Sequence, residues 1–323
     1  MKLRILADDL TGALDSAAAF VGETTVYLDR PGDDDPGVGV VATATRDVPR
    51  EALPMLLDPA RAWLRSADLA FKKVDSLLRG NTYAEVAYTA RAGRFSRVVF
   101  APAFPQQGRV TLDGRQWLLP SGRPTSERQP IDDGCIAEAF GVFGLPVVAS
   151  PTVYADGPVV WLPDVRNAGD LSVIAALSTG TKAQHWLWCG TAGLAYALAS
   201  VHGFAAGHNE FPLQRLPRAP LLIITASYHP VLREQWAMLK AVQKSAIVVP
   251  ESQHAALCSA LRAMDEGCEV AMFDLSPTRL LIPSEAAALL AGQMDVIVSC
   301  GCGVRNVKLV QGTELWANAQ GRN

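Results

Sequence analysis

The sequence predicts an α/β protein of two domains, each a mainly parallel sheet flanked by helices, with a cleft between them. Its 323 residues correspond to about two domains of ~150 residues each. Short apolar runs alternate with helical patterns, which is typical of parallel α/β layers. A proline-rich stretch without periodicity separates two such series. We therefore expect a first domain at 1–207, a linker at 208–220 and a second domain at 221–323.

The predicted elements follow one another as strand and helix in both domains. In the first domain the apolar runs predict strands at Leu3–Ala7, Thr24–Leu28, Val38–Ala44, Leu69–Val74, Val98–Ala101, Val147–Ala149, Val159–Leu162 and Trp186–Cys189. Helical spacing predicts helices at Gly12–Phe20, Arg50–Ser66, Thr82–Ala92, Leu171–Leu177 and Leu194–Val201. In the second domain we expect strands at Leu221–Thr225, Ala246–Val249, Val270–Phe273 and Val296–Ser299, with helices at Val231–Val242, His254–Met264 and Ser284–Ala291.

The composition excludes several classes of protein. Charged residues are 19% and hydrophobic residues 49%, so the chain is not mainly disordered. The net charge of −3 argues against binding to nucleic acid or to an anionic membrane. No apolar run reaches the ~18 residues of a membrane helix, and Asp8 and Asp9 come too early for a secretory signal. The six cysteines form no CxxC pair, which fits reduced thiols in the cytoplasm, and no metal site is predicted.

Two adjacent carboxylates, Asp8 and Asp9, directly follow the first predicted strand. Ligands of parallel sheets bind at the carboxyl ends of the strands. The pair suits a substrate hydroxyl, an amine or Mg²⁺, or a general base. Thr11 or Gly12 opens the next helix, whose N-terminus favours an anion. The alternative is that one of the two aspartates only caps this helix.

A second polar cluster ends the strand at Leu69–Val74. Strand alternation directs Lys73 and Asp75 to one face of the sheet and Lys72 to the other. Further polar residues crowd into the loop before the next helix: Ser76, Arg79, Gly80 and Asn81. Cations around one carboxylate suit a polyhydroxylated acid, with Asp75 binding a hydroxyl. The alternative is a surface strand of ion pairs, with asparagine capping the next helix.

Weaker signals end other strands. Arg109 follows two prolines that stiffen its loop, and Arg46 ends the strand at Val38–Ala44; each could bind a carboxylate. Asp164 and the segment Cys189–Gly193 end two later strands.

Together these segments resemble the four-carbon acid sugar kinase family, two-domain ATP-dependent kinases of threonate, erythronate or related acids. The matching segments are LADDLTGALD (6–15), ATRD (44–47), KKVDSLLRGN (72–81), APAFPQQGRVTLDG (101–114) and, more loosely, CGTAGLA (189–195). The resemblance implies an enzyme of carbohydrate metabolism that phosphorylates a hydroxyl of a short sugar acid, with ATP and Mg²⁺. Two alternatives stay open: a non-catalytic sugar-acid binding or regulatory protein that has lost ATP use, and an enzyme with another cosubstrate. A homodimer is one possible assembly.

The resemblance also implies which residues line the substrate pocket. These are Asp9, Arg46, Lys73, Asp75, Ser76 and Arg79, to which the clusters above add Asp8, Thr11, Gly80, Asn81 and Arg109. Arg46, Lys73 and Arg79 are candidates for the substrate carboxylate. Asp75 or Asp9 would accept the proton of the attacked hydroxyl.

The second half departs from the family pattern. Ala226 stands where the family has glycine in a Gly-Ser turn, and the loop at 300–304 lacks the family's Asp and Thr. The family's later Lys-Ser-Gly loop has no counterpart before Asn323. Nucleotide contacts are expected at Ser227, Gly301 and Gly303. We expect Mg·ATP to bind weakly or not at all, while a sugar acid still binds the first domain.

Overall fold

The chain divides into two compact units, residues 1–206 and residues 207–323, and each is described by itself. The computed structural model describes residues 1–20, 24–33, 36–119, 127–131, 134–153 and 155–204 of the first unit. In the second unit it describes 221–225, 237–238, 247–248, 270–274, 296–299, 307–309 and 315–316. The expected helices at 254–264 and 284–291, and most of the one at 231–242, lie outside these residues.

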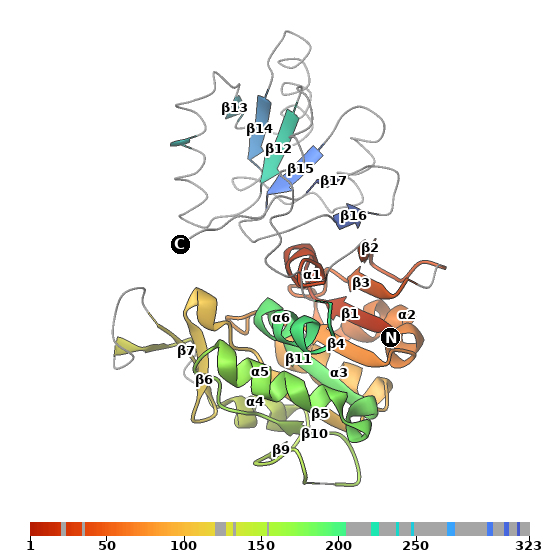
Figure 1. The fold of residues 1–323 in the computed structure, drawn as a ribbon, viewed down its shortest axis with the longest axis vertical. Helices are drawn as coiled ribbons and strands as arrows, with labels where there is room; N and C mark the ends of the chain where they lie inside the picture. Colours follow the sequence, from red (N-terminus) through yellow and green to blue (C-terminus); the bar gives the residue numbers. More distant parts are fainter. Residues whose placement is uncertain are drawn as a thin grey trace. The chain divides into compact units, whose positions relative to one another are not determined.

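The first unit is built on one parallel sheet (Figure 1). Its strands are β1 (Leu3–Ala7), β2 (Thr24–Leu28), β3 (Val38–Ala42), β4 (Leu69–Lys73), β5 (Arg97–Ala101), β9 (Val147–Val148), β10 (Val159–Trp161) and β11 (Trp186–Gly190). Within this unit their order is β2-β3-β1-β4-β11-β5-β10-β9, and every pairing is parallel. The α/β class expected from alternating strands and helices is therefore confirmed.

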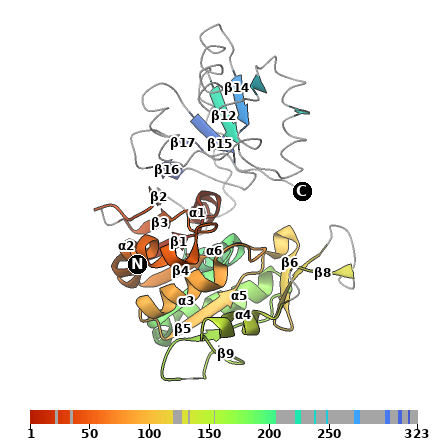
Figure 2. The same ribbon diagram turned by 180° about the vertical axis from the view of Figure 1, so that it is seen from behind.

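Helices cover both faces of this sheet, as the two opposite views show (Figures 1 and 2). One face carries α1 (Leu10–Ala17), α5 (Ala168–Ala176) and α6 (Ala192–Val201); the other carries α2 (Leu53–Arg65), α3 (Thr82–Ala92) and α4 (Ile136–Val142). Among the described residues, no helix combines the length and the apolar character needed to cross a bilayer.

The helix boundaries differ from the sequence prediction at their caps. The helix α1 begins before Gly12 because Asp9 accepts a hydrogen bond from the Gly12 amide and so caps it. The helix α5 begins before Leu171 because Asn167 accepts bonds from the amides of residues 169 and 170. Capping by a polar side chain several residues upstream of the apolar pattern explains both shifts.

The core between the sheet and α2, α3 and α4 is aromatic and aliphatic. The Phe100 and Phe140 rings meet edge to face at 4.9 Å, and Tyr83 meets Phe140 at 5.0 Å. Leu57 and Leu64, at helical spacing in α2, are almost completely buried in the same cluster. Burying a large apolar side chain contributes roughly 1.5–3 kcal/mol, so this layer holds the helices on the sheet.

The register of the sheet brings the carboxyl ends of its central strands to one level. Ala7 of β1 pairs with Ala42 of β3 and with Lys73 of β4. Gly190 of β11 pairs with Lys73 and with Ala101 of β5. The loops that follow these strands therefore start side by side, although they are far apart in the sequence.

A small antiparallel sheet was not predicted. It consists of β6 (Arg109–Leu112), β7 (Arg115–Leu118) and β8 (Gln129–Pro130). The turn between β6 and β7 is Asp113-Gly114, and both residues have positive φ, of 52° and 72°. A two-residue Asp-Gly turn is a strong hairpin signal. The pair is present in the sequence, but a prediction based on parallel strands does not include a hairpin.

The second unit contains a parallel sheet as well. The described strands are β12 (Leu221–Thr225), β13 (Ile247–Val248), β14 (Val270–Asp274), β15 (Val296–Ser299), β16 (Val307–Leu309) and β17 (Leu315–Trp316). Five of them form the order β13-β14-β12-β15-β17, with parallel pairs throughout. Four of these strands match the strands expected from apolar runs.

A buried ion pair fixes α3 to β4 and yields a stability prediction. The Lys72 ammonium lies 2.7 Å from the Glu85 carboxylate, and both side chains are only 1% exposed. We expect Lys72→Met to lower the free energy of unfolding by about 3–5 kcal/mol, because it leaves Glu85 buried and unpaired.

The double variant Lys72→Met/Glu85→Met should recover most of this loss in urea unfolding, since it buries no charge. Burial raises the pKa of Glu85, so the single variant should lose more stability at pH 8 than at pH 5. Equal loss in the single and double variants would contradict the ion-pair account.

Candidate functional site

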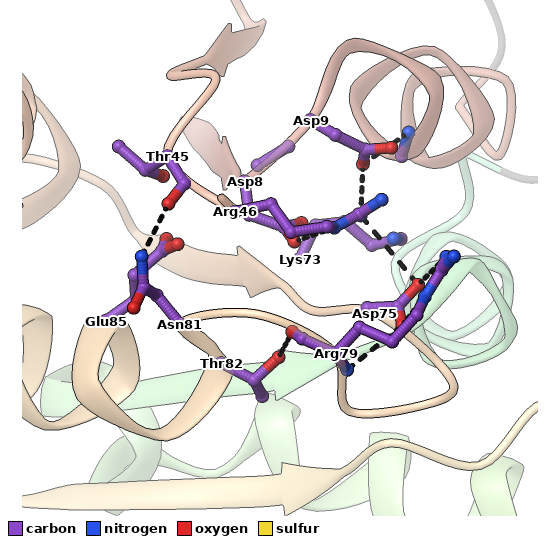
Figure 3. A network of polar contacts seen from close by, with 12 residues as sticks. Asp8, Asp9, Thr45, Arg46, Lys73, Asp75, Arg79, Asn81, Thr82 and Glu85 are labelled. Carbon is purple, nitrogen blue, oxygen red and sulfur yellow. Dashed lines mark hydrogen bonds and ion pairs between the residues drawn. The ribbon is translucent and has the colours of Figure 1, made fainter. Parts of the chain in front are cut away.

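The guanidinium of Arg46 occupies the centre of a polar cluster at the carboxyl ends of the central strands (Figure 3). Its Nε donates to Asp8 at 2.7 Å, and its Nη2 lies 2.7 Å from Asp9. The same Nη2 lies 3.8 Å from Asp75. Arg46 therefore bridges the loops that follow β1, β3 and β4.

The two adjacent aspartates have different surroundings. Asp8 is 4% exposed in its side chain, and its second oxygen, Oδ1, has no hydrogen-bond partner among the described residues. Asp9 is 24% exposed; besides binding Arg46 it accepts a hydrogen bond from the Gly12 amide at 2.9 Å. Of the two aspartates, Asp9 is therefore the one that caps α1, and it also binds Arg46 in the cluster.

Asp75 is held by a second arginine. The Arg79 guanidinium binds it with two hydrogen bonds, of 2.7 and 2.8 Å, and the amides of Leu77 and Arg79 donate to it as well. The side chain of Asp75 is 8% exposed, whereas that of Arg79 is 60% exposed. The cluster therefore opens to solvent on the Arg79 side.

Lys73 differs from both arginines. The residue is 6% exposed, and among the described residues its ammonium has no hydrogen bond or ion pair. It packs on the N-terminal turn of α1, where a Cβ on Gly12 would collide with its Nζ. Lys72 points to the opposite face and binds Glu85, as strand alternation predicts. The interpretation as a surface ion-pair strand is wrong, since β4 is buried along its whole length.

Two adjacent residues, Gly80 and Asn81, shape the loop around Arg46. Gly80 has a φ of +67°, and a Cβ there would collide with the Arg46 carbonyl. Asn81 donates from its backbone to the same carbonyl at 3.0 Å, and from its side-chain amide to the carbonyls of Thr45 and Val48 at 3.0 and 2.7 Å. Its side chain does not cap α3. These contacts position the loop that carries Arg46.

Gln116, which the sequence analysis overlooked, ties the antiparallel hairpin to the site loops. Its amide nitrogen donates to the carbonyls of Ser76 and Pro102 at 3.2 and 3.1 Å, and its oxygen accepts a hydrogen bond from Thr111. The hydroxyl of Thr191 likewise donates to the Ala103 carbonyl at 2.7 Å. A buried glutamine on a strand carries no sequence signal of its own, because its partners are backbone carbonyls.

The other predicted residues take varied places. Thr11 is half-buried in the first turn of α1. The backbone carbonyl of Ser76 accepts a hydrogen bond from the side-chain amide of Gln116. Arg109 starts β6 and donates to the carbonyl and side chain of Gln107. The nucleotide contacts expected at Ser227, Gly301 and Gly303 lie outside the described residues.

The charges in the cluster set its protonation states. Burial acts to raise the pKa of Asp75, but the hydrogen bonds and charge of Arg79 and the charge of Arg46 lower it to about 2. Its ionised form therefore stabilises the fold above pH 3.8, and this stabilisation is lost as the pH falls through about 2. Lys72, Lys73 and Arg46 similarly outweigh burial and lower the pKa of Asp8. Both carboxylates are ionised at neutral pH.

The acid cluster does not fit a magnesium site. Both oxygens of Asp75 bind Arg79, Oδ1 of Asp9 binds Arg46 and the Gly12 amide, and the Asp8 oxygen without a hydrogen-bond partner among the described residues is buried. Mg²⁺ needs several free oxygen ligands in octahedral array. Across the described parts of the chain, no three His, Cys, Asp or Glu side chains are grouped so that they could hold a metal. The cluster instead suits a ligand with hydroxyls and a negative charge.

Comparisons with known proteins agree with this chemistry. A family model described as a sugar-binding N-terminal domain matches residues 3–135. The first unit is thus similar to a class of sugar-binding domains. Two D-threonate kinases, from Salmonella typhimurium and Bordetella bronchiseptica, are each 30% identical over 73% of this chain. A D-threonate kinase of Cupriavidus necator is 28% identical over 93% of the chain and 75% of its own length.

These matches support a relationship of the chain to the four-carbon acid sugar kinase family. The matched part spans 60% of the Salmonella relative and 62% of the Bordetella relative.

Solved structures show the same fold at low identity. A Salmonella typhimurium LT2 protein is 18% identical and matches with a TM-score of 0.67 over 100% of this chain and 96% of its own. A Haemophilus influenzae protein is 16% identical and matches with a TM-score of 0.58 over 94% and 86%. At these identities the likeness concerns the fold alone.

The close approach of Gly80 to Arg46 gives a prediction for this site. Gly80→Ala should lower the free energy of unfolding by at least about 1–2 kcal/mol, because a left-handed backbone disfavours a Cβ. It should also displace Arg46, since the new Cβ meets the Arg46 carbonyl.

Gly141→Ala in α4 is the matched control, because a Cβ there meets nothing within 4 Å and alanine favours helix. Urea unfolding measures both variants. Equal stability of the two would contradict the packing of Gly80 against Arg46.

Proposed function

We propose that the chain is a kinase that phosphorylates a hydroxyl of a short sugar acid, with D-threonate as the first compound to test. Similarity to this family supports kinase chemistry, and three relatives are named D-threonate kinases. The observation that carries the proposal is the buried Lys73 ammonium, which has no anionic partner within the described chain, beside carboxylates that can bind hydroxyls.

The substrate carboxylate would bind at Lys73. Arg46 and Arg79 already have carboxylate partners, at distances of 2.7 Å. A buried ammonium is costly without a counter-charge, and a substrate carboxylate would supply one. This assigns the acid end of the substrate to the α1 side of the cluster and leaves both arginines as positioning groups for Asp8, Asp9 and Asp75.

The hydroxyl end would then face Asp9 and Asp75. Asp75, with a pKa of about 2, is ionised at neutral pH and accepts a hydrogen bond from a hydroxyl. A carboxylate of such low pKa is a weak base, but phosphoryl transfer passes through a loose transition state that needs orientation more than proton abstraction. Asp75 would therefore orient the attacking oxygen, and its Oδ would receive the proton late in the transfer.

ATP is the proposed phosphoryl donor, with Mg²⁺ neutralising its phosphates. The acid cluster does not fit a magnesium site, so no step is assigned to the metal there. Release of ADP from Mg·ATP on addition of D-threonate tests the kinase assignment. Binding of D-threonate without ADP release would instead identify the chain as a sugar-acid binding protein.

Lys73→Met tests where the substrate carboxylate binds. The change removes the charge but keeps an unbranched apolar stem, and the affinity for D-threonate should fall roughly ten- to a hundredfold. Titration calorimetry measures this loss. Threitol, which lacks the carboxylate, should bind the wild type and the variant alike.

Lys2→Met removes an exposed lysine at the start of the chain and is the control. Undiminished D-threonate affinity in folded Lys73→Met would overturn the assignment of the carboxylate to Lys73.

Asp75→Asn tests the hydroxyl end. The amide keeps the shape of the carboxylate but loses the charge that orients the attacking hydroxyl and receives its proton, so turnover of D-threonate should fall ~10²- to 10⁴-fold while the protein stays folded. ADP release and thermal unfolding are the measurements.

Asp29→Asn is the matched control, since Asp29 is exposed and its φ of 65° is one that asparagine also adopts. Wild-type turnover in Asp75→Asn would give Asp75 a purely structural role.

A further inference from the structure

Asp15 is a buried acid of α1 that the function proposed above does not use. It is 7% exposed, and among the described residues its carboxylate has no hydrogen bond or ion pair. A buried carboxylate without such partners is rare, because its charge is poorly solvated. It lies within the LADDLTGALD segment, where the sequence analysis assigned it no role.

The geometry of α1 places Asp15 on the side of the helix that meets Lys73. Gly12 and Asp15 are three residues apart and so lie on the same face of the helix. Lys73 packs onto this face at Gly12, where only the absence of a side chain leaves room for its ammonium. A buried acid and a buried ammonium, both unpaired within the described chain, therefore lie one helical turn apart.

Few other charges face Asp15. Asp9 at the N-cap repels it, and Lys73 of β4 attracts it. The remaining elements packed against α1 contribute Arg4 in β1, Tyr27 in β2 and Tyr196 in α6, and β3 has no ionisable residue. The Arg4 guanidinium binds the Pro36 carbonyl, and Tyr27 packs on Trp63. Lys73 is thus the cation that acts on Asp15.

We infer that Asp15 is a positioning residue for the substrate site: its carboxylate faces Lys73 and sets how much of that positive charge is available to an anionic substrate. This inference rests on the proposed function. When Asp15 is ionised, it partly offsets the charge of Lys73 and repels a substrate carboxylate. When Asp15 is protonated, the full positive charge of Lys73 is available to the substrate carboxylate.

The change between ionised and protonated Asp15 falls within the physiological pH range. Burial raises the pKa of Asp15 to about 6, with Lys73 opposing this shift and Asp9 adding to it. An incoming carboxylate would raise the pKa further, so binding takes up a proton near neutral pH. The substrate itself stays ionised, since carboxylic acids of this kind have pKa values of about 3.3–3.9. Affinity should therefore fall as the pH rises through about 6.

Titration calorimetry of the full chain with D-threonate, in two buffers of different ionisation enthalpy, measures this proton directly. The wild type should take up a fraction of a proton at pH 6.5. Its dissociation constant should be roughly three- to tenfold larger at pH 7.5 than at pH 5.5. Binding without proton uptake and without pH dependence would overturn the inference, and it would leave the proposed function intact.

Asp15→Asn assigns the effect to this residue. The folded variant should bind D-threonate without proton uptake, with the same affinity at both pH values and roughly three- to tenfold more tightly than the wild type at pH 7.5. Asp156→Asn, at an exposed position, should retain the wild-type pH profile. A merely structural role of Asp15 would weaken binding at every pH and leave the proton uptake unchanged.

If Asp15→Asn does not fold, a second variant tests the inference. In that case Lys73→Met replaces it: without the ammonium whose charge Asp15 offsets, the residual binding of D-threonate should lose most of its pH dependence between pH 5.5 and 7.5. Residual binding with the full wild-type pH dependence would overturn the inference. Absence of D-threonate binding to the wild type at any pH would instead overturn the proposed function and this inference together.

Discussion

The site depends on one guanidinium that holds three carboxylates together. Without Arg46, the side chains of Asp8, Asp9 and Asp75 would repel one another at the edge of the sheet, where Asp8 is almost fully buried. Asp8, Asp9 and Asp75 carry three negative charges, and Arg46, Lys73 and Arg79 carry three positive ones. Ionised Asp15 adds one further negative charge nearby, so an anionic ligand would bring the net charge to minus two. A proton taken up by Asp15 keeps it at minus one.

The sequence was sufficient for the α/β class because the strands of a covered parallel sheet are mainly apolar, and β1, β3, β4 and β5 are each buried along their whole length. The apolar pattern by itself failed where polar residues form structure. The hairpin of β6 and β7 begins at Arg109 and turns at Asp113-Gly114, so it lacks an apolar run. The early start of α5 depends on Asn167, whose capping bonds are not part of the apolar pattern.

The residues of the candidate site could be predicted where they lie at the carboxyl ends of strands. Asp8, Arg46, Lys73 and Asp75 each follow or end a central strand, and a parallel sheet brings such ends together. Their pairing was not predictable, because the same arginine could face a substrate or a carboxylate of the protein. Asp15 was missed because an acid in a helix is ordinarily exposed; its burial follows from the packing of α1 on the sheet.

The adjacent lysines of β4 make the register of that strand depend on ion pairing as well as on packing. A shift by one residue turns every side chain of a strand to the opposite face. If Phe71 took the place of Lys72, Glu85 would be buried without a cation, which is a costly error. If Lys73 took that place, Glu85 would keep a cation and the substrate side would lose one. The ion pair with Glu85 therefore disfavours a shift of β4 in one direction but not in the other.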